Sequence, residues 1–320
     1  MRYPQFLKKN DTIGITAMSA AINDKLGEYE NSINYLKSQG FDIKQSTNVF
    51  TSGLVSGSAK ERIRQLNALL NDPVVKAIII ARGGDLLFEI LPYIDYDLIA
   101  KANIPLMGYS DPTSFLYSVT VNCDLATFYG FNGSSFDFDN SLACANCLRL
   151  LQGESITQYA FESYQGYLDT EPQPVKWEAS VDSLSLSGRI IGGCIECLNN
   201  LFGTPYDHTA DFLDRYQEDG IIWFFDVYAL SSIELYLSLL KMRYMGYFNN
   251  CKAVLFSRVA FAKEEKNFSY KDAFAKALID IPYVYNCDLG HTNSKMTIVL
   301  GSLINIEYSE HKGSLTTFFR

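Results

Sequence analysis

Short apolar runs alternate with amphipathic segments along the first half of the chain. The runs at 12–17 and 75–81 are apolar on both faces, which is typical of buried strands in a parallel sheet. Between them, apolar residues recur at helical spacing from Leu26 to Leu36, and Gly40 ends this helix. The predicted elements are strand 12–17, helix 26–36, helix 58–70, strand 75–81, helix 85–94 and strand 104–109. Strands and helices in alternation predict an α/β fold with a parallel sheet.

The pattern changes at residues 166–182, which hold two prolines, several acidic residues and no sustained periodicity. We interpret this segment as an interdomain linker between an N-terminal α/β domain at 1–165 and a C-terminal α/β domain at 183–320. The second half is predicted to contain strand 186–191, a short helix after Gly192 and Gly193, strand 220–226, a helix with Ile233, Tyr236, Leu237, Leu240 and Tyr244 on one face, strand 253–257, and antiparallel strands in the tail.

Composition and charge indicate a folded globular protein and disfavour polyanionic partners. With 320 residues, 48% hydrophobic and 20% charged, the chain can bury one large or two medium cores and is not disordered. The formal net charge is −9, and no run of Lys or Arg opposes it. A nucleic-acid polymer or an anionic membrane is therefore not expected as a partner.

The N-terminus has no apolar signal region, and no stretch approaches the roughly 18 apolar residues of a membrane span. Seven cysteines, an odd number in a long chain, fit a reducing compartment. We therefore expect a cytoplasmic protein.

Two C-x-x-C pairs, Cys144 with Cys147 and Cys194 with Cys197, raise the possibility of zinc. Each pair lies in a helix-like stretch, where residues three apart share a buried face, and the separation between the pairs exceeds the usual zinc spacing. The chain also has only three histidines. We expect core cysteines, no metal and no cofactor.

The turn at Ser110 is the most informative segment for chemistry. The strand at 104–109 runs into Ser110, and Asp111 with Pro112 then opens a helix. Such a turn lifts a serine out of a sheet and directs the N–H groups of a helix N-terminus toward an oxyanion beside it. The turn resembles a nucleophile elbow without the second glycine, although a serine before Asp-Pro is also an ordinary helix cap.

A second turn, Arg82-Gly83-Gly84, follows the preceding strand. In a parallel sheet it would lie at the same carboxyl edge as Ser110, where α/β sheets bind ligands. Glycines there let backbone N–H groups approach a substrate closely, so Gly83 is a candidate binding residue. The alternative is a glycine turn without a ligand.

In the second half, His291 follows Gly290, and Asp226 ends the strand at 220–226. A carboxylate at the end of a buried strand is costly unless it is solvated or paired, and pairing with a histidine would orient the imidazole. The alternative for His291 is a hydrogen-bonded structural residue, and spacing alone does not prove that the two side chains meet.

These segments carry a resemblance to the LD-carboxypeptidase family, serine peptidases of murein tetrapeptide recycling whose relatives include the microcin C immunity hydrolases. The matching blocks, in family order, are LKKNDTIGITA, VKAIIIARGG, PLMGYSDPTSFL, GRIIGGCIECLNNLFGTPYD, GIIWFFD and CDLGHTNSKMTIVLG. The resemblance implies an N-terminal Rossmann- or flavodoxin-like parallel-sheet domain, a C-terminal mixed α/β domain, an active site in the cleft between them, and a homodimer.

The resemblance also implies a Ser-Glu-His triad. By position, Ser110 is the nucleophile, His291 the general base and Asp226 the acid, and the backbone N–H groups of Gly84 and Asp111 are the oxyanion donors.

Three departures from the family pattern stand out. Asp226 replaces the usual Glu, so it is expected to reach His291 only through a backbone shift or a water, or not at all. Asp85-Leu86-Leu87 follows the glycine turn where relatives often continue with Tyr-Gly, which alters the expected oxyanion pocket. Tyr129-Gly130-Phe131 stands in place of a His-Gly-Pro segment, which predicts a changed specificity.

The function implied is a metal-independent serine carboxypeptidase or amidase acting on a small peptide, with release of terminal D-Ala from murein tetrapeptide as the leading hypothesis. Arg82 is the candidate cation for the terminal carboxylate, unless it is a solvated surface residue. The first alternative is an immunity-type amidase for peptidyl or aminoacyl nucleotides, in which Trp177 stacks on a nucleobase or merely packs against a domain. The second alternative is a catalytically weak homologue that binds peptides.

Overall fold

The computed structural model describes residues 1–136 and 141–320. The chain divides into two compact units. Unit 1 comprises residues 1–154, 204–206 and 297–301, and unit 2 comprises residues 155–203, 207–296 and 302–320. This division differs from the predicted domains, because unit 2 begins at Ser155 and includes the segment that was expected to be a linker.

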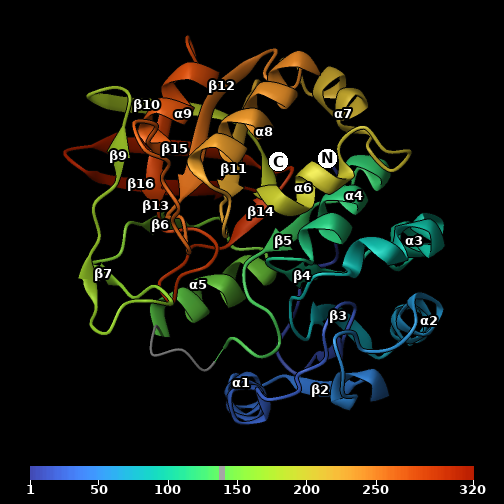
Figure 1. The fold of residues 1–320 in the computed structure, drawn as a ribbon. Coiled ribbons are helices and arrows are strands. Elements are labelled where there is room, and N and C mark those ends of the chain that lie inside the picture. Colours follow the sequence, from blue (N-terminus) through green and yellow to red (C-terminus); the bar gives the residue numbers. More distant parts are fainter. Residues whose placement is uncertain (137–140) are drawn as a thin grey trace. The chain divides into compact units, whose positions relative to one another are not determined.

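Unit 1 is built on a six-stranded sheet in the order β14-β5-β4-β3-β1-β2 (Figure 1). Its strands are β1 (Thr12–Thr16), β2 (Asp42–Gln45), β3 (Val75–Ile80), β4 (Leu106–Gly108), β5 (Thr127–Tyr129) and β14 (Ile298–Leu300). Strands β1 to β5 are parallel, and β14 pairs antiparallel with β5. The order β2-β1-β3-β4-β5 is that of flavodoxin-like folds, which confirms the predicted fold class.

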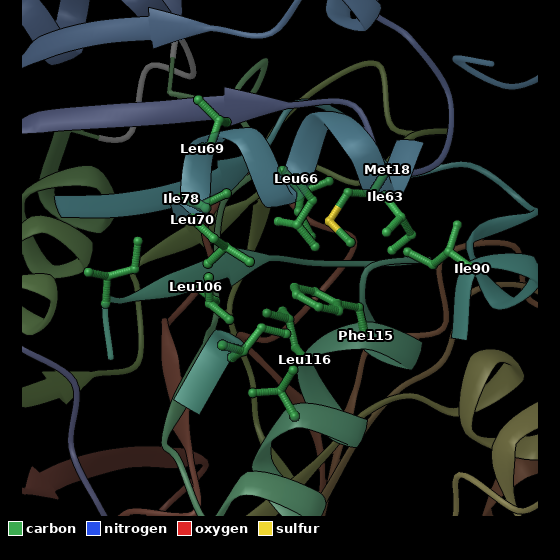
Figure 2. Close-up of a cluster of buried hydrophobic side chains, with 14 of the residues drawn as sticks. Met18, Ile63, Leu66, Leu69, Leu70, Ile78, Ile90, Leu106, Phe115 and Leu116 are labelled. Carbon is green, nitrogen blue, oxygen red and sulfur yellow. The ribbon is translucent and has the colours of Figure 1, made fainter. Parts of the chain in front are cut away.

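The helices of unit 1 lie on both faces of this sheet. They are α1 (Leu26–Ser38), α2 (Ala59–Leu70), α3 (Tyr96–Ala102), α4 (Thr113–Cys123) and α5 (Ser141–Leu151), with 3₁₀ helices η1 (Thr47–Phe50) and η2 (Leu87–Tyr93). Figure 2 shows the core on one face, where α2 and α4 pack over β3 and β4 through residues such as Leu66, Ile78, Leu106 and Phe115. On β4, Met107 contacts Cys147 of α5 instead, so α5 covers the opposite face.

The predicted helix at 85–94 is a 3₁₀ helix. Pro92 lies within it and has no N–H to donate to a helical hydrogen bond, which disfavours an α-helix. Ser58 caps the start of α2, because its side chain accepts a hydrogen bond from the Glu61 N–H at 3.3 Å.

Unit 2 contains a mixed eight-stranded sheet in the order β6-β16-β15-β10-β11-β12-β13-β9. Its strands are β6 (Thr157–Tyr159), β9 (Glu178–Ala179), β10 (Ser183–Cys194), β11 (Ile221–Asp226), β12 (Cys251–Ser257), β13 (Tyr283–Cys287), β15 (Leu303–Ser309) and β16 (Lys312–Phe318), and β7 (Ser163–Tyr164) pairs with β8 (Gln173–Pro174) separately. Strands β10 to β13 are parallel, and the other pairs in the sheet are antiparallel. The helices are α6 (Ile195–Leu201), α7 (Thr209–Arg215), α8 (Ser232–Tyr244) and α9 (Tyr270–Ala277).

The segment 166–182 is an integral part of unit 2. Strand β9 pairs with β13, and Trp177 is fully buried against β16, where a Cβ on Gly313 would lie 2.3 Å from its ring. Trp177 therefore anchors the expected linker in the core of this unit, while the other residues of the segment are exposed or half-buried. Its lack of periodicity reflects strands of only two residues.

In the part of the chain that the structure describes, no helix combines the length and the apolar composition needed to cross a bilayer.

Candidate active site

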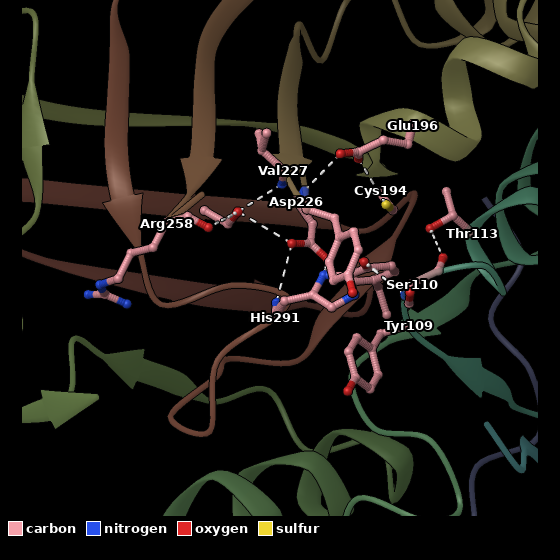
Figure 3. Close-up of polar contacts among 12 residues, drawn as sticks. Tyr109, Ser110, Thr113, Cys194, Glu196, Asp226, Val227, Arg258 and His291 are labelled. Carbon is pink, nitrogen blue, oxygen red and sulfur yellow. Dashed lines mark hydrogen bonds and ion pairs between the residues drawn. The ribbon is translucent and has the colours of Figure 1, made fainter. Parts of the chain in front are cut away.

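Ser110 occupies a strained turn between β4 and α4 in unit 1. Its φ is +71°, a conformation that residues other than glycine seldom adopt. The Ser110 N–H donates to the Tyr129 hydroxyl at 3.1 Å, and the Ser110 carbonyl accepts from the Thr113 N–H at 2.9 Å and the Thr113 hydroxyl at 2.6 Å (Figure 3). These bonds hold the serine in the strand-turn-helix geometry that the sequence predicts.

The glycine turn after β3 lies beside this serine, as predicted from the order of the strands. A Cβ on Gly83 would lie 3.1 Å from the Ser110 Cβ and 3.2 Å from its Oγ, so a larger residue here would press against the serine. Gly84 is exposed, and its N–H donates to no residue in the described part of the chain. The turn thus presents a backbone donor at the same sheet edge as Ser110.

Asp111 fastens the surrounding loops of unit 1 to each other. Its buried carboxylate accepts hydrogen bonds from the Ser19 hydroxyl and, at 2.8 Å, from the Leu87 N–H. Burial raises the pKa of this carboxyl. The bond to Leu87 fixes the segment Asp85 to Leu87, where the sequence departs from the family pattern.

Arg62 also supports these loops, a role that its sequence position does not indicate. This arginine of α2 is fully buried and donates to the carbonyls of Met18 and Leu86 at 3.0 and 2.9 Å. It also forms an ion pair with Glu89 at 2.6 Å. In the sequence it is an ordinary polar position of an amphipathic helix, and nothing there indicates burial.

Arg82, the candidate cation for a substrate carboxylate, already has acceptors within unit 1. Its guanidinium donates to Asp24 at 2.9 Å and to the Ile22 carbonyl at 3.1 Å. The hydrogen bond from Arg82 lowers the pKa of Asp24. A role for Arg82 in binding substrate stays a prediction.

In unit 2, Asp226 and His291 are in direct contact (Figure 3). Asp226 ends β11 and is fully buried, and its Oδ2 lies 2.8 Å from Nδ1 of His291. Its Oδ1 accepts from the His291 N–H and the Ser257 hydroxyl, both at 3.3 Å. Of the expected ways for the shorter acid to reach His291, this direct contact rules out a bridging water and a missing contact, and it leaves an adjustment of the backbone.

Gly290 makes this direct contact possible. Its φ is +69°, and a Cβ there would lie 2.0 Å from the carboxyl carbon of Asp226. The glycine brings the backbone that carries His291 against the carboxylate, which offsets the missing methylene. Ser257 supports the acid from the other side, since its hydroxyl also accepts from the Val227 N–H at 2.9 Å. Nothing in the sequence around Ser257 predicts this role.

Three aromatic rings gather next to the imidazole of His291. The Tyr228 ring centroid lies 4.6 Å from the His291 centroid, and the Tyr167 centroid lies 6.2 Å from it. Phe261 packs against both tyrosines, at 5.0 Å from Tyr228 and 5.6 Å from Tyr167. We call these three residues the aromatic cluster. Tyr228 is 40% exposed and Tyr167 is 56% exposed, so the cluster can contact a ligand.

Trp177 is not placed to stack on a nucleobase, because it is fully buried. Its Nε1–H donates to Asp288 at 3.0 Å. Asp288 also accepts from the Phe161 N–H at 3.0 Å and forms an ion pair with Arg258 at 2.7 Å. Burial raises the pKa of Asp288. Of the two roles considered for Trp177, the structure matches packing within a domain.

The two C-x-x-C pairs lie in different units. Cys144 and Cys147 are buried on α5, whereas Cys194 ends β10 and Cys197 lies in α6. Among the residues described, no group of three or more His, Cys, Asp or Glu side chains is arranged to hold a metal ion.

Comparison with known proteins identifies relatives over nearly the whole chain. The microcin C7 self-immunity protein MccF of Escherichia coli is 23% identical, and the alignment covers 97% of this chain and 94% of MccF. A Bacillus subtilis protein named "Probable murein peptide carboxypeptidase" is 25% identical, over 93% of this chain and 89% of its own. The solved structure of MccF in complex with aspartyl sulfamoyl adenosine has a TM-score of 0.86 at 21% identity, covering 99% of this chain and 98% of that chain, and so shares the fold.

Two family models match the chain in the expected order. The model of the LD-carboxypeptidase N-terminal domain matches residues 13–130, and that of the C-terminal domain matches residues 187–306. Together they cover well over half of the sequence, including Ser110, Asp226 and His291. The chain therefore belongs to the LD-carboxypeptidase family.

Proposed function

We propose that the protein is a serine hydrolase that cleaves an amide bond near the C-terminus of a small peptide, with Ser110 as the nucleophile, His291 as the general base and Asp226 as the acid. The observation that carries the proposal is the 2.8 Å contact between Asp226 and Nδ1 of His291. With Nδ1 facing the carboxylate, Nε2 is the nitrogen left to accept a proton from a nucleophile. The strained Ser110 turn supports the choice of nucleophile.

In the proposed reaction, Ser110 Oγ attacks the amide carbonyl while His291 Nε2 takes its proton. The N–H groups of Gly84 and Asp111 stabilise the oxyanion, and Asp226 stabilises the imidazolium. His291 then donates the proton to the leaving amine, and water hydrolyses the acyl-enzyme to release a carboxylate and restore Ser110. General-base catalysis contributes about 10²–10⁴-fold, and each oxyanion donor about 10²–10³-fold.

Murein tetrapeptide, with release of its terminal D-Ala, is the substrate that we propose first. The family model and the name of the Bacillus subtilis relative support it. Arg82 is the proposed cation for the terminal carboxylate, which would then have to compete with Asp24 for the guanidinium.

A second candidate substrate is an aminoacyl or peptidyl nucleotide, and the aromatic cluster favours it. Exposed tyrosine rings beside His291 offer faces on which a nucleobase can stack, a role that buried Trp177 cannot serve. MccF, a relative of similar fold, has been solved with aspartyl sulfamoyl adenosine.

A fluorophosphonate probe, which labels activated serines, tests the proposed chemistry. We expect labelling of the natural chain, no labelling of Ser110→Ala, and a loss of at least about 100-fold in labelling rate for His291→Ala. Ser118→Ala, in the neighbouring helix α4, is the serine control and should label normally. No labelling of the folded natural chain would favour the peptide-binding alternative over the enzyme.

Turnover of an LD-tetrapeptide and of an aspartyl-nucleotide analogue then separates the two substrates. The proposal expects the peptide to be cleaved with the higher kcat/KM and Ser110→Ala to be inactive on both. Cleavage of the nucleotide analogue alone would identify the immunity-type activity.

We also propose that the protein is a homodimer. Helix α8 exposes Ile233, Leu237 and Tyr244, which share one face with the half-buried Leu240. An apolar stripe on an exposed helix can pair with the same stripe of a second copy about a two-fold axis.

A further inference from the structure

The backbone turn at residues 228–230 of unit 2 is held by a single carboxylate. Oε1 of Glu196, at the start of α6, accepts hydrogen bonds from three successive N–H groups, those of Tyr228 at 3.0 Å, Ala229 at 2.8 Å and Leu230 at 3.2 Å. Its Oε2 lies 3.2 Å from the Cys194 thiol. Figure 3 shows Glu196 directed toward the segment that follows Asp226. Charge-assisted bonds of this kind are stronger than neutral ones, so Glu196 fixes the turn firmly.

The same turn carries a side chain that contacts the proposed base. Tyr228 begins the turn, and its ring centroid lies 4.6 Å from that of His291, with the two planes tilted by 49°. The Tyr228 carbonyl accepts from the Phe261 N–H at 2.8 Å, which anchors the residue on its other side. The backbone of Tyr228 is thus fixed at both its N–H and its carbonyl.

We infer that Glu196 and Tyr228 are positioning residues for His291. Asp226 fixes the Nδ1 end of the imidazole, and the Tyr228 ring restrains its tilt and excludes water from one face. Glu196 acts through Tyr228, by setting the backbone from which that ring projects. The inference rests on the proposed function only for its effect on rate, since the contacts themselves lie within unit 2.

Activity measurements test whether the two residues act together. Tyr228→Ala and Glu196→Ala are each expected to lower kcat/KM by about 10–100-fold, mainly through kcat, because a small misplacement of a catalytic group is costly. Tyr228→Phe keeps the ring and should stay within about twofold of the natural chain. The double variant should lose no more than the worse single variant, because both changes remove one restraint.

Glu234→Ala is the matched control for Glu196→Ala. Glu234 is also a glutamate that accepts a backbone hydrogen bond next to this turn, from the Ser231 N–H at 2.8 Å, but it caps α8 and bonds no residue of the turn. The Glu234→Ala variant should lose stability to a similar extent as Glu196→Ala, but it should keep its activity. Equal losses of activity in the two variants, or multiplied losses in the double variant, would overturn the inference.

An NMR measurement without substrate separates this inference from the proposed function. The Nδ1–H proton of His291, which faces the Asp226 carboxylate 2.8 Å away, should exchange faster with water, and its signal should broaden, in Tyr228→Ala and Glu196→Ala. It should stay sharp in Tyr228→Phe and Glu234→Ala. An unchanged signal in both alanine variants would refute the inference even if the enzyme is active, whereas an inactive natural chain with the expected broadening would refute only the proposed function.

Discussion

At the scale of single residues, Gly290 determines how closely the loop that carries His291 approaches Asp226. A Cβ at this position would lie 2.0 Å from the carboxyl carbon, and the φ of +69° is itself unfavourable for alanine. We expect Gly290→Ala to displace the loop and to lower kcat/KM by about 100-fold or more. Gly27→Ala is the control, because a Cβ there would meet nothing within 4 Å, and its activity should be unchanged.

Asp111 gives a prediction about the pH dependence of stability. Burial raises its pKa above the ordinary 3.8, so the folded chain binds this proton more tightly than the unfolded chain. The protonated carboxyl therefore stabilises the folded state fully when the pH is below its pKa in the unfolded chain. This contribution is lost as the pH rises through its higher pKa in the folded chain. Asparagine does not titrate. Relative to the natural chain, Asp111→Asn should thus gain free energy of unfolding as the pH rises above 3.8, the ordinary pKa of the carboxyl, as measured by urea denaturation.

Asp24→Asn is the contrasting variant. The hydrogen bond from Arg82 lowers the pKa of Asp24, so its stabilising contribution is lost as the pH falls through the folded pKa. Relative to the natural chain, Asp24→Asn should therefore lose free energy of unfolding as the pH rises, which is the opposite of the trend for Asp111→Asn. A difference between Asp111→Asn and the natural chain that does not vary with pH would contradict the assignment for Asp111.

At the scale of elements, Trp177 anchors the segment before β10 into unit 2 through its bond to Asp288. Trp177→Phe leaves this buried carboxylate without one of its donors, so we expect the free energy of unfolding to fall by about 1–3 kcal/mol. Catalytic rates should change little. If Trp177→Phe instead weakened binding of a nucleotide analogue at unchanged stability, Trp177 would have to stack on the nucleobase after all.

The elements that the sequence predicts well are those with a regular local pattern of apolar residues, either at helical spacing or as a continuous buried run. The runs that became β1, β3, β11 and β12 are apolar on both faces, and the structure confirms each as a parallel strand. The prediction fails where a contact distant in sequence decides the structure. The segment 166–182 has no period because its strands are only two residues long and its one buried residue, Trp177, is held by the distant Asp288. Strand β14 joins the sheet of unit 1 although its sequence neighbours belong to unit 2.

The residues of the candidate site also fall into a group that local sequence signals predict and a group that they do not. Ser110, Asp226 and His291 follow strand ends or a glycine, which are local signals that a sequence displays. Glu196, Ser257 and the aromatic cluster act through contacts between separate elements, and nothing in their local sequence marks them. The direct contact of Asp226 with His291 depended on the backbone of Gly290, which the length of the acid side chain alone did not indicate.

At the scale of the whole molecule, α8 turns the apolar face that the sequence predicts away from its own core. Leu235, Leu239 and Met242 are buried, whereas Leu237 is 55% and Tyr244 is 79% exposed. Two copies of α8 packed antiparallel about a two-fold axis would cover these stripes. Glu234 lies in the first turn of α8 and Lys241 in the last turn, so antiparallel copies would bring charges of opposite sign toward each other. The Lys241 ammonium, which donates to the carbonyls of Asn199 and Phe202 in its own chain, would then be shared with the second copy.

This arrangement predicts that a charge in the middle of the stripe separates the two copies. Leu237→Lys would place an ammonium opposite its own equivalent across the two-fold axis, where it is both desolvated and repelled. We expect the natural chain to have the mass of two chains by light scattering, and Leu237→Lys to have the mass of one with its fold retained. Ile279→Lys is the control, because Ile279 is 70% exposed outside α8 and should leave the dimer intact. A natural chain that is monomeric at micromolar concentration, or a Leu237→Lys variant that stays dimeric, would show that α8 is not the contact between copies.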